Sequence, residues 1–145
     1  MKLRTSIAVT AAAALIGAGA FMLPALASAR VPTHTLKFTS VTKGQTMFSV
    51  TSGAVQDTDV NAKGTTIGYD MLYFAYVSGA TAPVNLAFAV AGGIIYGTGQ
   101  VNITSMAFTN GKVTGGTGAF KNAAGTITEK TLSKTKSAVV ITYHT

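Results

Sequence analysis

The chain has 145 residues, eleven basic against four acidic side chains, a formal net charge of +7 and no cysteine. The absence of cysteine excludes disulfide bonds and thiol chemistry, so the fold must be held by its apolar core. The basic residues are dispersed and are not interleaved with aromatic ones, which predicts no nucleic-acid partner. We interpret the excess charge as a solvated basic surface, with attraction to anionic envelope polymers as the alternative.

The first residues have the pattern of an export signal. Lys2 and Arg4 give a charged start, residues 7–26 are apolar, and Ala27-Ser28-Ala29 fits a signal-peptidase cleavage site. We therefore expect residues 1–29 to be a secretion signal peptide. An uncleaved anchor is the alternative, because the apolar run approaches the length that spans a bilayer.

Cleavage at that point makes residues 30–145 a single domain that is secreted or held in the cell envelope, without a stable membrane anchor. This domain keeps nine basic residues against four acids, a charge of about +5. A domain of about 115 residues buries roughly two-thirds of its unfolded surface, which is enough for independent folding without disulfide bonds.

Strand signals fill this domain, since Thr, Val, Ile, Tyr and Phe recur in short runs between Gly-, Asn- and Lys-rich breaks, and no segment has a helical apolar stripe. The predicted strands are residues 34–41, 46–55, 65–77, 83–91, 94–103, 106–114, 125–132 and 137–144. Hairpin turns are expected at Gly92-Gly93, at Asn110-Gly111 and at residues 133–136. The pattern predicts an all-β fold, an eight-stranded antiparallel up-and-down β-barrel, because closure removes exposed edges and leaves room for one small ligand. An open β-sandwich is the alternative.

Both faces of the third predicted strand are apolar. Tyr69, Met71 and Tyr73 share one face, whereas Leu72 lies with Asp70 on the other. A barrel in isolation buries only one face of each strand, so the second apolar face predicts a neighbouring subunit and a homo-oligomer.

The two histidines of the chain, His34 and His144, lie near opposite ends of the domain sequence. If the first and last strands pair antiparallel, these histidines become neighbours at the barrel rim. Two histidines without cysteine or an adjacent carboxylate make a poor metal site, so no metal is predicted.

Four segments follow one another in an informative order: residues 44–50 (GQTMFSV), 66–70 (TIGYD), 94–99 (IIYGTG) and 115–120 (GGTGAF). Together they resemble the dirigent and allene oxide cyclase-like barrel family. The resemblance implies a frequently trimeric barrel whose apolar cavity guides the coupling or cyclisation of a small organic molecule, without a metal or nucleotide cofactor. Ala119 and Ala124 stand where plant members carry polar groups, which weakens the transfer of the plant chemistry to this chain.

The chain has only four carboxylates, Asp57, Asp59, Asp70 and Glu129, so any acid–base group of that type is among them. Asp57 and Asp59 precede a turn-like segment and are interpreted as turn caps, with a cavity-mouth role as the alternative. Asp70 interrupts an apolar strand, where it serves either catalysis or pairing with a lysine or the backbone.

The candidate catalytic residues are Asp70, Tyr69 and Tyr96, because they lie in the segments that resemble the family and a tyrosine offers a hydroxyl on a rigid ring. The candidate ligand-binding residues are Met71, Tyr73, Phe88 and Asp57. The expected function is binding of a small hydrophobic molecule in the lumen, with dirigent- or cyclase-like steering of its reaction left open. The alternative is a non-enzymatic surface or matrix protein with a filled barrel.

Overall fold

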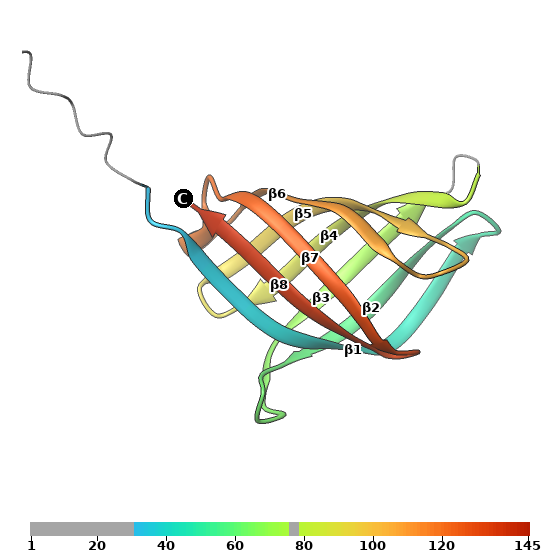
Figure 1. The fold of residues 1–145 in the computed structure, drawn as a ribbon, viewed down its shortest axis with the longest axis horizontal. Helices are drawn as coiled ribbons and strands as arrows, with labels where there is room; N and C mark the ends of the chain where they lie inside the picture. The colour runs from blue at the N-terminus through green and yellow to red at the C-terminus, as the bar shows by residue number, and fades with distance from the viewer. Residues whose placement is uncertain (1–30, 76–78) are drawn as a thin grey trace, which may run out of the picture.

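The computed structural model describes residues 31–75 and 79–145, and it shows a closed antiparallel barrel (Figure 1). Its strands are β1 (His34–Ser49), β2 (Ser52–Val60), β3 (Thr66–Ala75), β4 (Thr81–Val90), β5 (Gly93–Asn102), β6 (Phe108–Gly116), β7 (Ala124–Ser133) and β8 (Lys136–His144). Each strand pairs with the next in the chain, and β1 pairs with β8 to close the ring. The predicted eight-stranded barrel is confirmed, and the β-sandwich is excluded.

The predicted signal peptide, residues 1–29, lies outside the described residues. Within the described ranges, no helix has the length and hydropathy needed to cross a bilayer. The described part of the domain consists of these strands and one short 3-10 helix, η1 (Gly118–Phe120).

The first strand is longer than predicted, because it continues through Gly44 where we expected a break. Its register with β2 shifts between Thr42 and Gly44, which marks a β-bulge. One extra residue reverses the side-chain alternation, so Thr42 before the bulge and Gln45 after it both line the barrel interior. The β1–β2 turn consequently falls at residues 50–51, and β2 extends to Val60.

The predicted hairpin turn at Asn110-Gly111 is wrong, because both residues lie inside β6. Asn110 has a φ of 55°, and the β5–β6 register shifts nearby, between Thr98 and Gln100. Asn-Gly favours positive φ in bulges as well as in turns, so the dipeptide alone could not distinguish the two. The chain reverses instead at residues 103–107. The expected turns at Gly92-Gly93 and at residues 133–136 are present.

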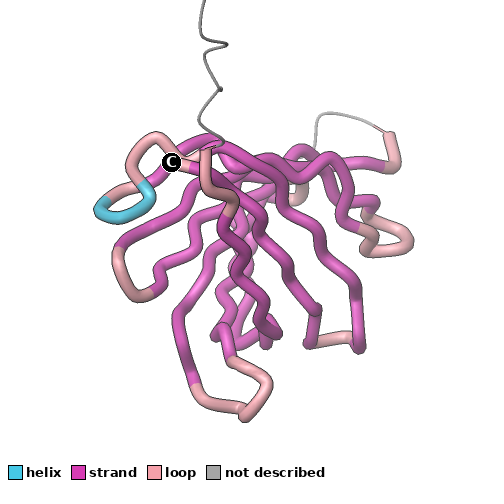
Figure 2. Tube along the Cα trace, turned by 60° about the vertical axis from the view of Figure 1, so that its left-hand side comes forward, coloured by secondary structure: helices cyan, strands magenta, loops and turns pink. Residues whose placement is uncertain are grey.

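One end of the barrel is closed by the glycine-rich segment after β6. Ala119 N donates to Gly92 O at 2.9 Å and Thr117 N donates to Ile94 O at 2.8 Å, which fixes this segment on the β4–β5 turn. Phe120 is buried below it and meets Tyr143 edge to face, with ring centroids 5.5 Å apart. Figure 2 shows the short helix η1 of this segment close to the C-terminus.

The two histidines also lie at this closed end. His34 pairs with Tyr143 and stacks on its ring at 5.4 Å, whereas His144 pairs with Ala124 on the other side of β8. The antiparallel pairing of the first and last strands is therefore confirmed. Among the described residues, no group of three or more His, Asp or Glu side chains is arranged to hold a metal ion.

Candidate functional site

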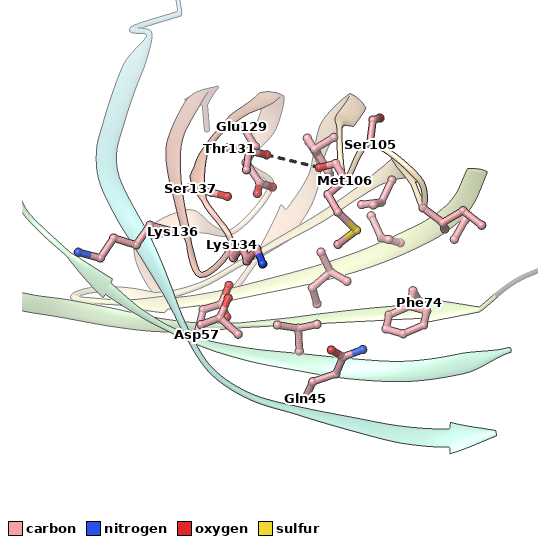
Figure 3. A pocket seen from close by; sticks show the side chains of 18 of the residues that line it. Gln45, Asp57, Phe74, Ser105, Met106, Glu129, Thr131, Lys134, Lys136 and Ser137 are labelled. Atoms are coloured by element: carbon pink, nitrogen blue, oxygen red, sulfur yellow. Dashed lines mark hydrogen bonds between the residues drawn. The ribbon is translucent and has the colours of Figure 1, made fainter. Parts of the chain in front are cut away.

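The other end of the barrel is hollow. A cavity of about 580 Å³ opens between the β1–β2, β5–β6 and β7–β8 turns, where Val50, Met106 and Lys134 are exposed (Figure 3). Its wall is mostly apolar and comes from all eight strands, with Val55, Leu72, Phe74, Val84, Val101 and Phe108 among its residues. The lumen is thus packed at the closed end and empty toward the mouth, so the premise of a completely filled barrel is wrong.

All four carboxyl side chains of the chain face the lumen. Asp57 and Glu129 line the cavity, whereas Asp59 and Asp70 lie deeper, with 0% and 8% of their surface exposed. The eight lysines of the described residues are all exposed. The turn-cap interpretation of Asp57 and Asp59 is wrong, because both belong to β2 and alternate with outward residues.

Asp57 and Asp70 face each other on neighbouring strands, and Ser40 from β1 connects them. Ser40 Oγ lies 2.8 Å from Asp57 Oδ2 and 2.9 Å from Asp70 Oδ2, and Ser40 itself is 4% exposed. A second chamber of about 30 Å³ lies between Asp57, Asp70 and Glu129, below the main cavity. It has room for about one water molecule.

Burial raises the pKa of Asp70 to about 9, and the neighbouring carboxyls of Asp59 and Asp57 add to this shift, while the hydrogen bond between Ser40 and Asp70 opposes it. Burial also raises the pKa of Asp59 to about 6, although its hydrogen bond with Asp70 lowers it. Among the described residues, no other hydrogen-bond donor contacts either carboxylate oxygen of Asp59, and none contacts Asp57 Oδ1. These carboxyls therefore hold protons at a pH where an exposed aspartate is ionised.

Glu129 occupies the β7 side of the cavity floor. Burial raises the pKa of this carboxyl, a hydrogen bond with Ser137 lowers it, and the charge of Asp57 raises it. Figure 3 shows Lys134 directed into the cavity and Lys136 extending away from it. The floor can therefore donate or accept protons, and Lys134 and Lys136 both border the cavity.

Four predicted site residues point out of the barrel and away from the lumen. Tyr69, Met71, Tyr73 and Tyr96 lie on the outer face, with exposures of 62%, 48%, 41% and 41%. Side chains alternate along a strand, so a lumen-facing Asp70 forces residues 69 and 71 outward. The expectation that these side chains line the lumen is therefore incorrect.

Three predicted site residues do lie inside the barrel. Asp57 lines both the cavity and the small chamber, and Asp70 lines the chamber. Phe88 is 2% exposed and packs on Phe38 at a ring-centroid distance of 5.8 Å, so it forms the floor of the chamber and does not reach the main cavity.

The sequence interpretation did not single out Ser40, Glu129 or Lys134 as site residues. A signal for Glu129 was available, because Glu129 lies two residues after Ile127 and therefore on the same face of β7. Ile127 is buried in the lumen, so Glu129 also faces inward. Ser40 had no comparable signal, since its role depends on the pairing of β1 with both β2 and β8.

Comparisons with known proteins support the fold. No family model matches the chain, and no curated protein matches it in sequence. Similar solved structures include a pterocarpan synthase dirigent protein, with a TM-score of 0.64, 17% identity and coverage of 79% of this chain and 89% of that one. A pyocyanin demethylase has a TM-score of 0.58 at 15% identity, covering 76% and 99%. An exo-specific intermolecular Diels-Alderase has a TM-score of 0.58 at 10% identity, covering 79% and 99%. The predicted resemblance to dirigent-type barrels is confirmed at the level of the fold.

Proposed function

We propose that this protein is an exported barrel that binds a small hydrophobic organic molecule through its open end and exchanges a proton with it at the cavity floor. The observation that carries the proposal is an apolar cavity of about 580 Å³ whose floor holds Asp57 and Glu129. This volume lies within the usual range for small-molecule sites, which combine apolar walls with a few polar groups.

The chemistry that such a floor supports is isomerase-like. The apolar wall holds a flexible molecule in one conformer, and a carboxyl that keeps its proton can polarise a carbonyl or hydroxyl oxygen. The similar structures named as a dirigent protein, a demethylase and a Diels-Alderase show that barrels of this fold accompany several reactions on organic molecules. They support a ligand-binding barrel, and the reaction is a matter for experiment.

Binding is tested with N-phenyl-1-naphthylamine, a neutral apolar fluorophore. We expect saturable binding to the wild-type protein and its loss in Val101→Trp, because Val101 lines the cavity and a larger ring fills it. The control is Gln100→Trp, since the neighbouring side chain is exposed on the opposite side of β5. Absence of saturable binding to the wild type, or equal binding to Val101→Trp, contradicts the proposal. Native mass spectrometry of protein from its own secretion medium then identifies a co-purified molecule.

We further propose that the protein is a homo-oligomer. The outer positions of β3, β4 and β5 carry no charge, and they expose Tyr69, Met71, Tyr73 and Tyr96 around the small residues Ala87 and Ala89. An exposed apolar patch of this kind on a soluble domain is typical of a subunit interface.

A further inference from the structure

The deep carboxyls and Ser40 form one connected row from the closed half of the barrel to the cavity floor. Asp59 contacts Asp70, Asp70 contacts Ser40, and Ser40 contacts Asp57, which alone of the four lines the main cavity. The other side chains around the row are apolar (Leu72, Leu86, Phe88, Ile127, Val139), except Glu129 across the chamber.

Counting protons restricts the state of this row. A serine hydroxyl has one proton, so Ser40 can donate to only one of the two carboxyls that lie within 2.9 Å of its oxygen. The other short contact requires that a carboxyl donates to Ser40, and the contact between Asp59 and Asp70 requires another carboxyl proton. Every contact can therefore be a hydrogen bond only when the three carboxyls hold at least two protons, and with two protons they carry one negative charge.

Three arrangements satisfy this count with two carboxyl protons. In the first, Asp59 donates to Asp70, Asp70 donates to Ser40, and Ser40 donates to an ionised Asp57. In the second, every donor is reversed and the charge rests on Asp59. In the third, Asp57 donates to Ser40, and an ionised Asp70 accepts from both Ser40 and Asp59. Burying a charge is costly, and Asp59 and Asp70 are only 0% and 8% exposed, whereas Asp57 is half-buried and borders the cavity. The charge is therefore least costly on Asp57, even though its Oδ1 has no hydrogen-bond partner among the described residues.

We propose that Asp59, Asp70 and Ser40 form a directional hydrogen-bond chain that places its single negative charge on Asp57, at the floor of the ligand cavity. Asp57 is then the base of the site, and Ser40 is a positioning residue that keeps it ionised and oriented. The role of Asp57 as a base toward a ligand rests on the proposed function. The proton arrangement itself is a property of the ligand-free protein.

The test is carboxyl-resolved ¹³C NMR of the ligand-free protein, which has only four side-chain carboxyls to assign. At about pH 5 we expect an ionised Asp57 and protonated Asp59 and Asp70 in the wild type. Ser40→Ala removes the donor to Asp57, so the Asp57 signal should move toward the protonated state.

Ser137→Ala is the matched control, because Ser137 pairs with Ser40 in register but bonds Glu129, so only the Glu129 signal should move. Ser40→Thr keeps the hydroxyl and should retain the wild-type pattern. A protonated Asp57 in the wild type at about pH 5, or an unchanged Asp57 signal in folded Ser40→Ala, overturns the inference. The wild-type spectrum decides the direction even if Ser40→Ala does not fold. Failure of fluorophore binding leaves this result intact, so the two proposals fail separately.

Discussion

Asp70 shows how one residue can couple the stability of the barrel to pH. Its carboxyl is buried beside two others, so the folded protein keeps a proton on it that the unfolded chain releases above about pH 4. Asp59 and Glu129 are shifted in the same direction. Groups with a raised folded-state pKa contribute stability at low pH, which is lost as the pH rises toward the folded-state value.

We therefore expect the free energy of unfolding to decrease between about pH 5 and pH 8, by roughly 1.4 kcal/mol per pH unit for each extra proton held by the folded state. Urea unfolding across this range measures the slope. Asp70→Asn should flatten it, because an amide can still donate to Ser40 but does not titrate. The histidines are present in both proteins, so their titration cancels in the comparison. A stability that rises across this range contradicts the account.

The glycine-rich segment around η1 acts as the plug of the closed end. Gly118 has a φ of 58°, and a Cβ added there would collide with Gly92 O of the opposing turn. A side chain at this position thus adds backbone strain and separates two turns that hydrogen bond to each other. Gly118 is therefore required by close approach as well as by backbone conformation.

Gly118→Ala should lower the free energy of unfolding by roughly 1–3 kcal/mol, measured by urea denaturation. Gly44→Ala is the control, because a Cβ at Gly44 meets no atom within 4 Å and its φ is not positive. We expect a change below about 0.5 kcal/mol for this variant. Equal effects of the two substitutions would show that the plug geometry is not what makes Gly118 necessary.

Alternation and turn signals were enough to predict the number of strands and the closure of the barrel. They did not predict which face of each strand is internal, because β3 is apolar on both sides. Asp70 could have decided this, because its sequence neighbours Tyr69 and Met71 must point to the opposite face of the strand. The bulge at Thr42 and Gly44 was beyond the pattern, because a single glycine predicts a turn and a bulge equally well.

The site depended on contacts that join distant segments. Ser40 and Asp70 are 30 residues apart, and they meet because the register places Ser40 opposite Asp59 of β2 and Asp57 opposite Asp70 of β3. Asp57 was assigned to a turn because its strand was ended too early, at residue 55. The sequence therefore supplied the carboxyls as candidates, and the register of the strands decides how they act together.

The outside of the whole barrel is divided into two kinds of surface. The outer face of β3–β5 is uncharged and aromatic, whereas the outer faces of β6, β7 and β1 carry Lys112, Lys130 and Lys37 among threonines. Burying the first surface against a second copy removes apolar area from water and keeps the lysines solvated.

Tyr69→Lys should dissociate the proposed oligomer, because an ammonium would be buried in an uncharged interface. Analytical ultracentrifugation compares its mass with that of the wild type. The matched control is Thr128→Lys, an exposed position on β7 among the lysines, which should leave the mass unchanged. A monomeric wild type at micromolar concentration, or an unchanged Tyr69→Lys assembly, contradicts this interface.

The pairing of β1 with β8 places residues 34 and 144 together at the plugged end, away from the β1–β2, β5–β6 and β7–β8 turns at the mouth. A segment joined to the domain at either of these residues therefore extends from the plugged end of the barrel. A C-terminal tag can therefore tether the barrel to a sensor surface with its entrance facing the solution, and the turns at the mouth are free to be exchanged for other loops. Attachment points and cavity entrance thus lie at opposite ends of the barrel.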